Sequence, residues 1–214
     1  MKAIIFDLDG TLVHSAPDIH AAANVMLAHA GRDPVTLDQV IGFIGNGIEK
    51  TVERCLRATG GVPENLAPHC AEMNRAYGQD LTTLTRLFDG VRDTLDAASV
   101  PMAICTNKPE APARDLCQKM DLTRYFKAIT GGDSTPAIKP DPLPLLHTVA
   151  ALGLGVEDCL YVGDSVTDFR TARATGMAFA FYTGGYQPTK VEGLSPSECF
   201  DSWQGLDLAR FYPV

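Results

Sequence analysis

The chain has 214 residues, enough for one large domain or for a core with an inserted subdomain, and it is 45% hydrophobic and 21% charged, as is ordinary for a globular protein. Its formal net charge of −8 argues against nucleic acid or an anionic membrane as the main partner. No apolar stretch approaches the length of a membrane span and no secretory signal is visible, so we expect a cytoplasmic protein.

The cysteines support the same compartment. There are six, with no CxxC pair, and no histidine cluster stands at metal-ligand spacing. This pattern indicates free, reduced thiols rather than a disulfide or zinc framework. The cysteines are Cys55, Cys70, Cys105, Cys117, Cys159 and Cys199.

The first element is an apolar, β-branched and aromatic run at residues 3–6, which predicts a short strand buried on both faces. Asp7 and Asp9 follow it directly, and then Gly10 and Thr11. Ligands collect where a buried parallel strand ends, because backbone amides become free there. Two carboxylates at such an edge favour a divalent cation, or one acid that attacks and one that moves protons. Alone, a DxDG sequence is equally typical of a solvated turn.

Residues 15–83 have the pattern of a helical block. Ser15, with Asp18 three residues later, predicts a capped helix start. Apolar residues at helical spacing continue to Ala30, and Gly31 closes the predicted helix.

The block continues with shorter helices. Thr36 and Gln39 form a second capping-box pattern, and the helix that it opens breaks at residues 45–47, where two glycines flank an asparagine. Further helices are predicted at about residues 48–58 and 66–79. No part of the block has the pattern of a strand.

From residue 88 the pattern alternates between strand and helix, which predicts a parallel sheet covered on both faces, an α/β doubly wound fold of Rossmann-like type. Because the helical block interrupts this core after its first strand, we expect a core at residues 1–14 and 84–214 and an inserted helical cap at residues 15–83. The predicted strands lie at 101–105, 126–130, 159–162, 177–182 and near 199–200, and the predicted helices at 91–98, 110–120, 143–152 and 169–175, with a closing helix in the tail.

Polar side chains occur in four loops at the carboxyl ends of predicted strands. Each has an ordinary structural interpretation: Thr106 as a strand-end hydroxyl, Lys139 as a solvated lysine, and the later acids as caps of the following helix. Their occurrence in four successive loops favours an active site instead. The loops contribute Asp7 and Asp9, Thr106 and Asn107, Lys139, and Asp164 and Asp168.

The segments DLDGT, TNKP, IKPDP and GDSVTD match, in order, the four motifs of the haloacid-dehalogenase-like phosphohydrolases, and the insert resembles that of their helical-cap subgroup. Within this subgroup, LVHSAPD, IGNG, TNKP and GGD are most similar to the phosphoglycolate phosphatases, and the match covers residues 4 to about 186. His14 is a departure, since close relatives usually carry Asp there. We interpret His14 as a surface or hinge residue of the linker.

The resemblance implies a Mg²⁺-dependent phosphomonoester hydrolase that forms an aspartyl-phosphate. Asp7 would be the nucleophile, and Asp9 the general acid and then the general base. Mg²⁺ would bind the Asp7 carboxylate, the Asp9 backbone carbonyl and Asp164. Asp168 would orient Lys139 or a metal-bound water. The residues expected to bind the phosphoryl oxygens are Gly10, Thr11, Thr106, Asn107 and Lys139, of which Thr106 and Lys139 would also be catalytic.

In the cap, the loop at residues 45–47 is the candidate for entering the active site and reading the leaving group, because glycine allows close backbone approach to a ligand. The alternative is a flexible interhelical turn. The loop consists of Gly45, Asn46 and Gly47, and the candidate cations for a second anion contact are Arg32, Lys50, Arg54 and Arg75.

Several functions remain open at this point. The expected substrate is a small phosphorylated metabolite, 2-phosphoglycolate first, with a sugar phosphate or another small phosphate ester as the alternative. Asp9 favours phosphoryl transfer over dehalogenation, which needs no proton donor there. A phosphosugar mutase would share Asp7 and Asp9, and a non-catalytic phosphate- or protein-binding module is the alternative outside enzymes. We expect no nucleic-acid or membrane partner, and a monomer or weak homodimer.

Overall fold

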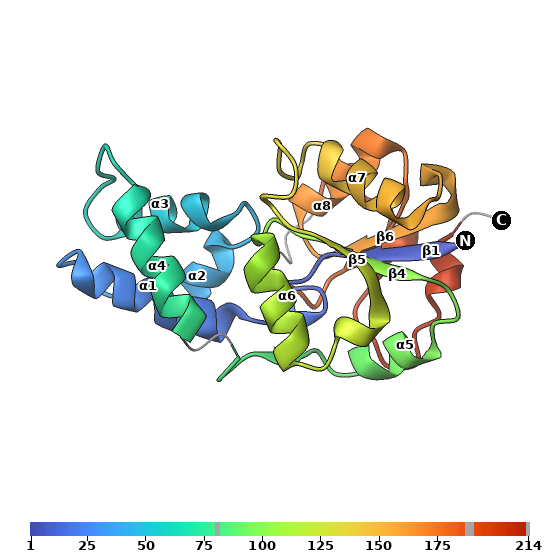
Figure 1. Cartoon of the computed structure of the whole chain (residues 1–214), viewed down its shortest axis with the longest axis horizontal. Helices are drawn as coiled ribbons and strands as arrows, with labels where there is room; N and C mark the ends of the chain where they lie inside the picture. Colours follow the sequence, from blue (N-terminus) through green and yellow to red (C-terminus); the bar gives the residue numbers. More distant parts are fainter. Residues whose placement is uncertain (80–81, 187–190, 213–214) are drawn as a thin grey trace. The chain divides into compact units, whose positions relative to one another are not determined.

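The computed structural model describes residues 1–79, 82–186 and 191–212, and the chain divides into two compact units (Figure 1). The α/β unit comprises Met1–His14 and Leu87–Val214, and the helical unit comprises Ser15–Arg86. Where the chain passes between them, β2 (Val13–His14) and β3 (Arg86–Leu87) pair as a two-stranded sheet. Sequence reasoning did not predict these strands, since two residues are too few to show a periodic pattern.

The α/β unit is built on a six-stranded sheet whose neighbouring strands are all parallel, which confirms the predicted fold class. β1 is fully buried because it has a strand on each side and helices over each face, so its apolar run has no solvent-facing residue. The strands, in sheet order, are β5 (Phe126–Thr130), β4 (Met102–Cys105), β1 (Ala3–Phe6), β6 (Cys159–Gly163), β7 (Ala178–Tyr182) and β8 (Cys199–Phe200).

Helices cover both faces of this sheet, and Figure 1 shows α7 and α8 on one side and α5 on the other. On the α7–α8 side, Ile5 and Tyr161 from the strands pack with Leu145 and Phe169 from the helices in one buried cluster. The helices are α5 (Val91–Ala97), α6 (Glu110–Lys119), α7 (Leu143–Leu152) and α8 (Val166–Thr175), with short 3-10 helices η1 (Thr123–Tyr125), η2 (Val156–Asp158), η3 (Pro196–Glu198) and η4 (Leu208–Phe211).

The start of α8 corrects a predicted boundary. The sequence pattern placed it at Phe169, whereas the helix begins at Val166. Ser165 is the N-cap: its hydroxyl accepts a hydrogen bond from the Asp168 amide, and the Asp168 carboxylate accepts one from the Ser165 amide. This capping box satisfies amide groups that would otherwise lack a partner, so the helix can start before its first large apolar residue.

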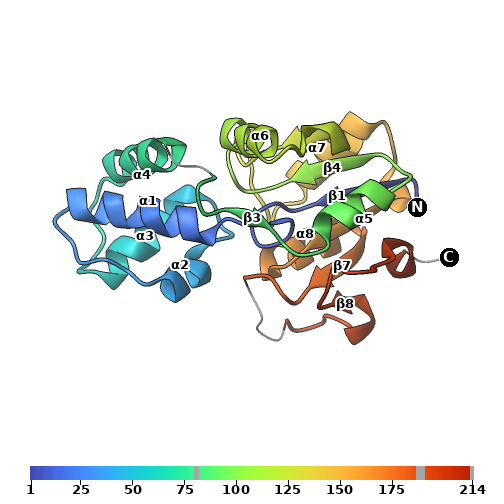
Figure 2. The same cartoon turned by 90° about the horizontal axis from the view of Figure 1, so that it is seen from below.

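The helical unit contains the four predicted helices, and α1 packs on the other three (Figure 2). The capping box predicted at Thr36 and Gln39 is confirmed, because each side chain accepts a hydrogen bond from the other residue's amide. The helices are α1 (Ala16–His29), α2 (Leu37–Phe43), α3 (Ile48–Ala58) and α4 (Ala67–Gln79).

The capping box predicted at Ser15 and Asp18 is wrong. Ser15 occupies the N-cap position of α1, but its side chain makes no capping hydrogen bond. Asp18 is 4% exposed, and its carboxylate accepts hydrogen bonds from the amides of Leu84 and Thr85 and from the Thr85 hydroxyl, at 2.6–3.1 Å. The acid therefore ties the first turn of α1 to the segment that leaves the helical unit.

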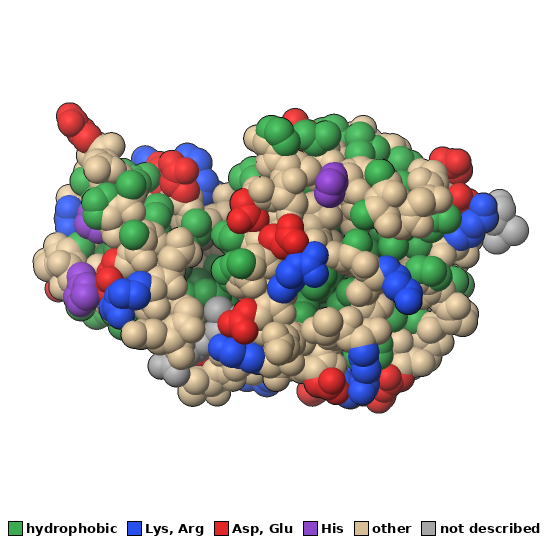
Figure 3. Space-filling model, in the orientation of Figure 1, with side chains coloured by type: hydrophobic (Ala, Val, Ile, Leu, Met, Phe, Trp, Pro, Cys, Tyr) green, Lys and Arg blue, Asp and Glu red, His purple; other side chains and the backbone are tan. Residues whose placement is uncertain are grey.

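Three further observations concern the surface and the thiols. All six cysteines are free, as expected. In the part of the chain that the structure describes, every helix is too short or too polar to cross a membrane. On the face of the α/β unit drawn in Figure 3, acidic and basic side chains are interspersed, and α6 carries the surface ion pairs Arg114–Glu110 and Lys119–Asp115.

The Asp18 contacts give a stability prediction. Asp18→Ala leaves the amides of Leu84 and Thr85 without the buried carboxylate that accepts their hydrogen bonds, so the free energy of unfolding should fall by about 2 kcal/mol in urea titrations followed by circular dichroism. Asp18→Asn keeps one acceptor oxygen and should lose less. Asp38→Ala, which removes an exposed acid from the first turn of α2, is the control and should cost at most about 1 kcal/mol. Equal losses for Asp18→Ala and Asp38→Ala would contradict the assignment.

Candidate active site

The predicted site residues of the α/β unit lie at one edge of the sheet because the register of its parallel strands aligns their ends. Phe6 on β1 is paired with Ile104 on β4 and with Val162 on β6. Asp7, Thr106 and Asp164 follow these three strands. The Asp7 amide continues the ladder by donating to the Val162 carbonyl oxygen at 2.8 Å.

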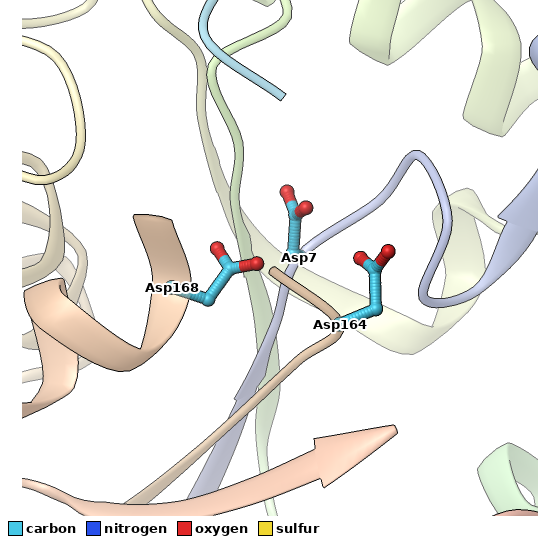
Figure 4. A group of neighbouring side chains, drawn as sticks. All are labelled: Asp7, Asp164 and Asp168. Atoms are coloured by element: carbon cyan, nitrogen blue, oxygen red, sulfur yellow. The ribbon is translucent and has the colours of Figure 1, made fainter. Parts of the chain in front are cut away.

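Three carboxylates converge at this edge from different elements. Figure 4 shows Asp7 on the loop after β1, Asp164 on the loop after β6, and Asp168 on α8. They are 7%, 2% and 0% exposed, and one oxygen of each lies within 4.8 Å of the others. Hard oxygen ligands at this spacing are the donor set that Mg²⁺ prefers, so the residues present fit a divalent cation.

A buried lysine lies against two of these carboxylates. Lys139 is 2% exposed, and its Nζ lies 2.9 Å from Asp7 Oδ1 and 2.6 Å from Asp168 Oδ1. The same Nζ also donates to the Tyr161 hydroxyl at 2.7 Å and to the Cys105 carbonyl oxygen at 3.0 Å. The ammonium group therefore has a polar partner in several directions although it is out of contact with bulk water.

The electrostatics of the site follow from this burial. Burial raises the pKa of Asp7 to about 7; Lys139 acts to lower that pKa, whereas Asp168 and Asp9 add to the rise. The pKa of Asp164 is raised well above its usual value, first by burial and then by Asp168 and Asp7. Burial alone would lower the pKa of Lys139, but Asp168 and Asp7 outweigh it, so that pKa is raised. Closely spaced carboxylates in low dielectric favour binding of a cation.

Asp168 makes two sets of contacts. Its Oδ1 faces Lys139 and accepts a hydrogen bond from the Tyr161 hydroxyl at 2.7 Å. Its Oδ2 accepts hydrogen bonds from the amide and the hydroxyl of Ser165, at 3.1 and 2.5 Å. The helix-capping interpretation and the Lys139 contact, which the sequence posed as alternatives, are therefore present together.

Asp164 is held by the turn after Asp7 and by the loop after β7. The Thr11 hydroxyl donates to Asp164 Oδ1 at 2.8 Å, and the Tyr186 amide donates to Oδ2 at 2.7 Å. Gly10 has a φ of +90°, and a Cβ there would lie 2.5 Å from Asp164 Oδ2, so this close approach requires glycine. The Gly10 amide donates to the Val13 carbonyl oxygen within the turn. Phosphate binding by Gly10 and Thr11 stays a prediction.

The loop after β4 brings the remaining predicted residues together. Thr106 is 2% exposed, and its hydroxyl accepts a hydrogen bond from the Lys108 amide at 3.2 Å. The Asn107 side chain binds the Lys139 backbone in both directions, donating to its carbonyl oxygen at 3.0 Å and accepting from its amide at 2.9 Å. Asn107 thus fixes the segment that carries the buried lysine.

Three residues at the site were missed by sequence reasoning. Lys108 Nζ lies 3.0 Å from both carboxylate oxygens of Asp9. Tyr161 was hidden within an apolar strand pattern, and Tyr186 follows β7 by a few residues. The available signals were the lysine inside TNKP and the glycine pair before Tyr186, which marks a fifth loop at the same edge.

His14, interpreted as a surface or hinge residue, lies in β2 and is half-buried. Its ring centroid is 5.8 Å from those of Phe88 and Tyr186. It is therefore part of an aromatic group beside the loop that holds Asp164.

The predicted substrate-reading loop lies in the helical unit and is described within that unit alone. Gly45 and Gly47 have φ values of +110° and +83°, and Gly47 is the N-cap of α3. Arg54 donates to the Asn46 side-chain oxygen and to the Phe43 carbonyl oxygen, each at 2.7 Å. Arg54 therefore holds this loop to α3.

The other candidate cations of the helical unit also contact groups of that unit. Arg32 donates to the carbonyl oxygens of residues 59 and 61. Lys50 pairs with Glu53 at 2.7 Å, and Arg75 pairs with Glu72 at 2.5 Å. Whether any of them contacts an anionic ligand stays a prediction.

Comparisons with known proteins agree on one family. A family model described as haloacid dehalogenase-like hydrolase matches residues 4–182. The chain is 45% identical over 218 residues to a phosphoglycolate phosphatase of Cereibacter sphaeroides, covering 98% of each protein. It is 42% identical over 192 residues to phosphoglycolate phosphatase 1 of Pseudomonas aeruginosa, covering 86% of this chain and 70% of that one. Its fold matches a crystal structure described as a predicted phosphoglycolate phosphatase from Haemophilus somnus, with a TM-score of 0.88, 30% identity and 95% of each chain covered.

The raised pKa of Asp7 predicts a pH-dependent response to metal. Its carboxyl is mostly protonated at pH 6 and mostly ionised at pH 8, and ionisation of the buried group costs stability as pH rises through about 7. A cation must displace that proton, so the apparent affinity for Mg²⁺ should be about tenfold higher at pH 8 than at pH 6. Calorimetric Tm measurements with and without Mg²⁺ should show the larger rise at pH 8. Asp7→Asn should reduce this difference, and the raised pKa of Asp164 accounts for the part that remains; equal Mg²⁺ shifts at both pH values in the unmodified protein would refute the prediction.

Proposed function

The chain belongs to the haloacid dehalogenase-like hydrolases and is a phosphatase, and we propose that it hydrolyses 2-phosphoglycolate with Mg²⁺ as cofactor. The observation that carries the proposal is the buried group formed by Asp7, Asp164, Asp168 and Lys139 at the sheet edge. The substrate is inferred from relatives up to 45% identical over nearly their whole length that are named phosphoglycolate phosphatases.

In the proposed reaction Asp7 is the nucleophile. Its carboxylate oxygen forms a bond to phosphorus while the bond from phosphorus to the ester oxygen breaks, giving an aspartyl-phosphate and glycolate. Asp9 donates a proton to the departing alkoxide oxygen. It then takes a proton from the water that attacks the aspartyl-phosphate, which regenerates Asp7 and releases inorganic phosphate. Both carboxylates come from one turn after β1, so a single strand end supplies the two groups.

Lys139 is proposed to stabilise negative charge on the transferring phosphoryl group. Its ammonium lies 2.9 Å from the Asp7 oxygen, and Asp168 and Tyr161 fix its position through contacts of 2.6 and 2.7 Å. A cation held in place before the reaction needs no reorganisation as charge develops, and burial strengthens its effect. Thr106 and Asn107 are proposed to bind phosphoryl oxygens beside it, with Gly10 and Thr11 shaping the turn that carries Asp7.

The proposed Mg²⁺ ligands are the carboxylates of Asp7 and Asp164 and the backbone carbonyl of Asp9. The ion would screen the repulsion between the anionic nucleophile and an anionic phosphate ester. Asp168 lies close enough to be a further ligand, but each of its oxygens already has two donors, Lys139 and Tyr161 on Oδ1 and the amide and hydroxyl of Ser165 on Oδ2, whereas each oxygen of Asp164 has one among the described residues. These contacts support a role for Asp168 in holding Lys139.

The loop formed by Gly45, Asn46 and Gly47 is proposed to contact the leaving group of the substrate and so to set specificity. Gly45 and Gly47 have no side chain that would keep a ligand from the backbone, and the contact of Asn46 with Arg54 gives the loop a defined shape. The free cysteines support a reducing, cytoplasmic location, and we propose a monomer or weak homodimer.

The test is phosphate release from a panel of small phosphate esters, with and without Mg²⁺. The unmodified enzyme should turn over 2-phosphoglycolate with the highest kcat/KM, and only with the metal. Asp7→Asn should lower kcat by at least about 10³-fold, because it removes the nucleophile. Its circular dichroism spectrum should match that of the unmodified protein, which excludes unfolding as the cause.

The other outcomes discriminate between functions. Highest turnover on a sugar phosphate would keep the mechanism and refute the proposed substrate. A requirement for a bisphosphate activator, with return of the phosphoryl group to the substrate, would identify a mutase. Metal-dependent ligand binding without turnover of any ester would refute the phosphatase mechanism.

A further inference from the structure

We propose that Lys108 is a positioning residue for Asp9: its ammonium group holds both carboxylate oxygens and fixes the direction in which Asp9 gives and takes its proton. The inference rests on the proposed function, in which Asp9 is the acid and base. It assigns a role to a lysine that neither the nucleophile nor the proposed metal site requires.

The contact between the two side chains is close and shielded from solvent. Lys108 Nζ lies 3.0 Å from Asp9 Oδ1 and 3.0 Å from Asp9 Oδ2, and the side chains are 6% and 11% exposed. By contrast, the ion pair of Lys119 with Asp115 on α6 has side chains 41% and 47% exposed. Exposed pairs hold their geometry weakly, whereas a shielded ammonium that contacts both oxygens restricts rotation of the carboxylate.

Lys108 is itself fixed at its backbone. Its amide donates to the Thr106 hydroxyl at 3.2 Å, and its carbonyl oxygen accepts from the Gly132 amide at 2.8 Å. A Cβ on Gly132 would lie 2.5 Å from the Asn107 carbonyl oxygen, so the turn after β5 packs directly on the turn that carries the lysine. The loop that carries the Lys108 ammonium group is therefore held in place by backbone contacts.

Such a contact suits a group that changes protonation state during the reaction. When one oxygen of a carboxyl group carries a proton, the other remains an acceptor, so Lys108 can hold Asp9 before and after transfer. The two lysines contact different acids: Lys139 contacts Asp7 and Asp168, whereas Lys108 contacts Asp9. The nucleophile and the proton-transfer group each have their own cation.

The main test is a double-mutant cycle of Lys108→Met and Asp9→Asn, assayed with 2-phosphoglycolate and saturating Mg²⁺. Lys108→Met should lower kcat by about 10²-fold and change KM by less than about threefold, because orientation of the proton-transfer group is lost while substrate binding is kept. In the Asp9→Asn background the same substitution should cost less than about threefold. Equal costs in the two backgrounds would show that Lys108 acts independently of Asp9 and would overturn the inference.

A second readout separates positioning from general damage to the site. With p-nitrophenyl phosphate the leaving group needs no proton, so the burst of p-nitrophenolate that accompanies aspartyl-phosphate formation should change by less than about threefold in Lys108→Met. The single-turnover rate with 2-phosphoglycolate should fall about 10²-fold. Loss of both rates in equal measure would contradict the inference.

The controls keep the result interpretable. Lys119→Met, on the exposed face of α6, should leave every rate within about twofold. Lys108→Arg retains a charged donor pair and should recover at least tenfold of the rate lost in Lys108→Met. If Lys108→Met does not fold, Lys108→Gln replaces it in the cycle with an expected loss of about tenfold. Absence of turnover by the unmodified enzyme would refute the proposed function, whereas full activity of a folded Lys108→Met would refute this inference alone.

Discussion

The burial of one ammonium group, that of Lys139, is the constraint on which the rest of the site depends. Transfer of a charged group from water to a protein interior costs several kcal/mol, and the cost is recovered only where opposite charges and hydrogen bonds surround it. Asp7 and Asp168 supply the charges, and Tyr161 and a carbonyl oxygen supply further partners. Lys139 in turn opposes the rise that burial causes in the pKa of Asp7, so the lysine and the Asp7 carboxylate stabilise each other's charged form.

This mutual dependence links the chemistry to the fold. Asp7 comes from the end of β1, Lys139 from the loop before α7, and Asp168 from the first turn of α8. Asp168 also closes the capping box with Ser165, so one carboxylate both starts a helix and orients the buried cation. Any shift of α8 along its axis would therefore move Asp168 away from Lys139 and disturb the charge balance at Asp7. Each of these three buried charged groups needs the others as partners, which keeps them together at the sheet edge.

The sequence predicted the sheet well because buried parallel strands are continuous apolar runs, and the predicted strands that became β4–β7 agree with the structure to within about one residue. The order of strands and loops along the chain was also sufficient to predict that Asp7, Lys139 and Asp164 lie at one edge of the sheet. It was insufficient where contacts join distant residues: nothing near Lys108 indicates Asp9, which lies 99 positions away. Local rules misled at Asp18, whose partners are 66 and 67 positions further on.

The central place of β1 in the sheet has a consequence for synthesis. Its partners, β4 and β6, lie beyond the helical unit in the chain. Ile4 can therefore pair only after Met102, and then Leu160, have been synthesised. At a translation rate of about 5–20 residues per second, the interval before β4 is complete is roughly 5–20 s, during which a wholly apolar strand has no sheet to join. The helices α1–α4 are contiguous and can pack within that time. The helical unit can thus be complete in the nascent chain before the strand that precedes Asp7 has a partner in the sheet.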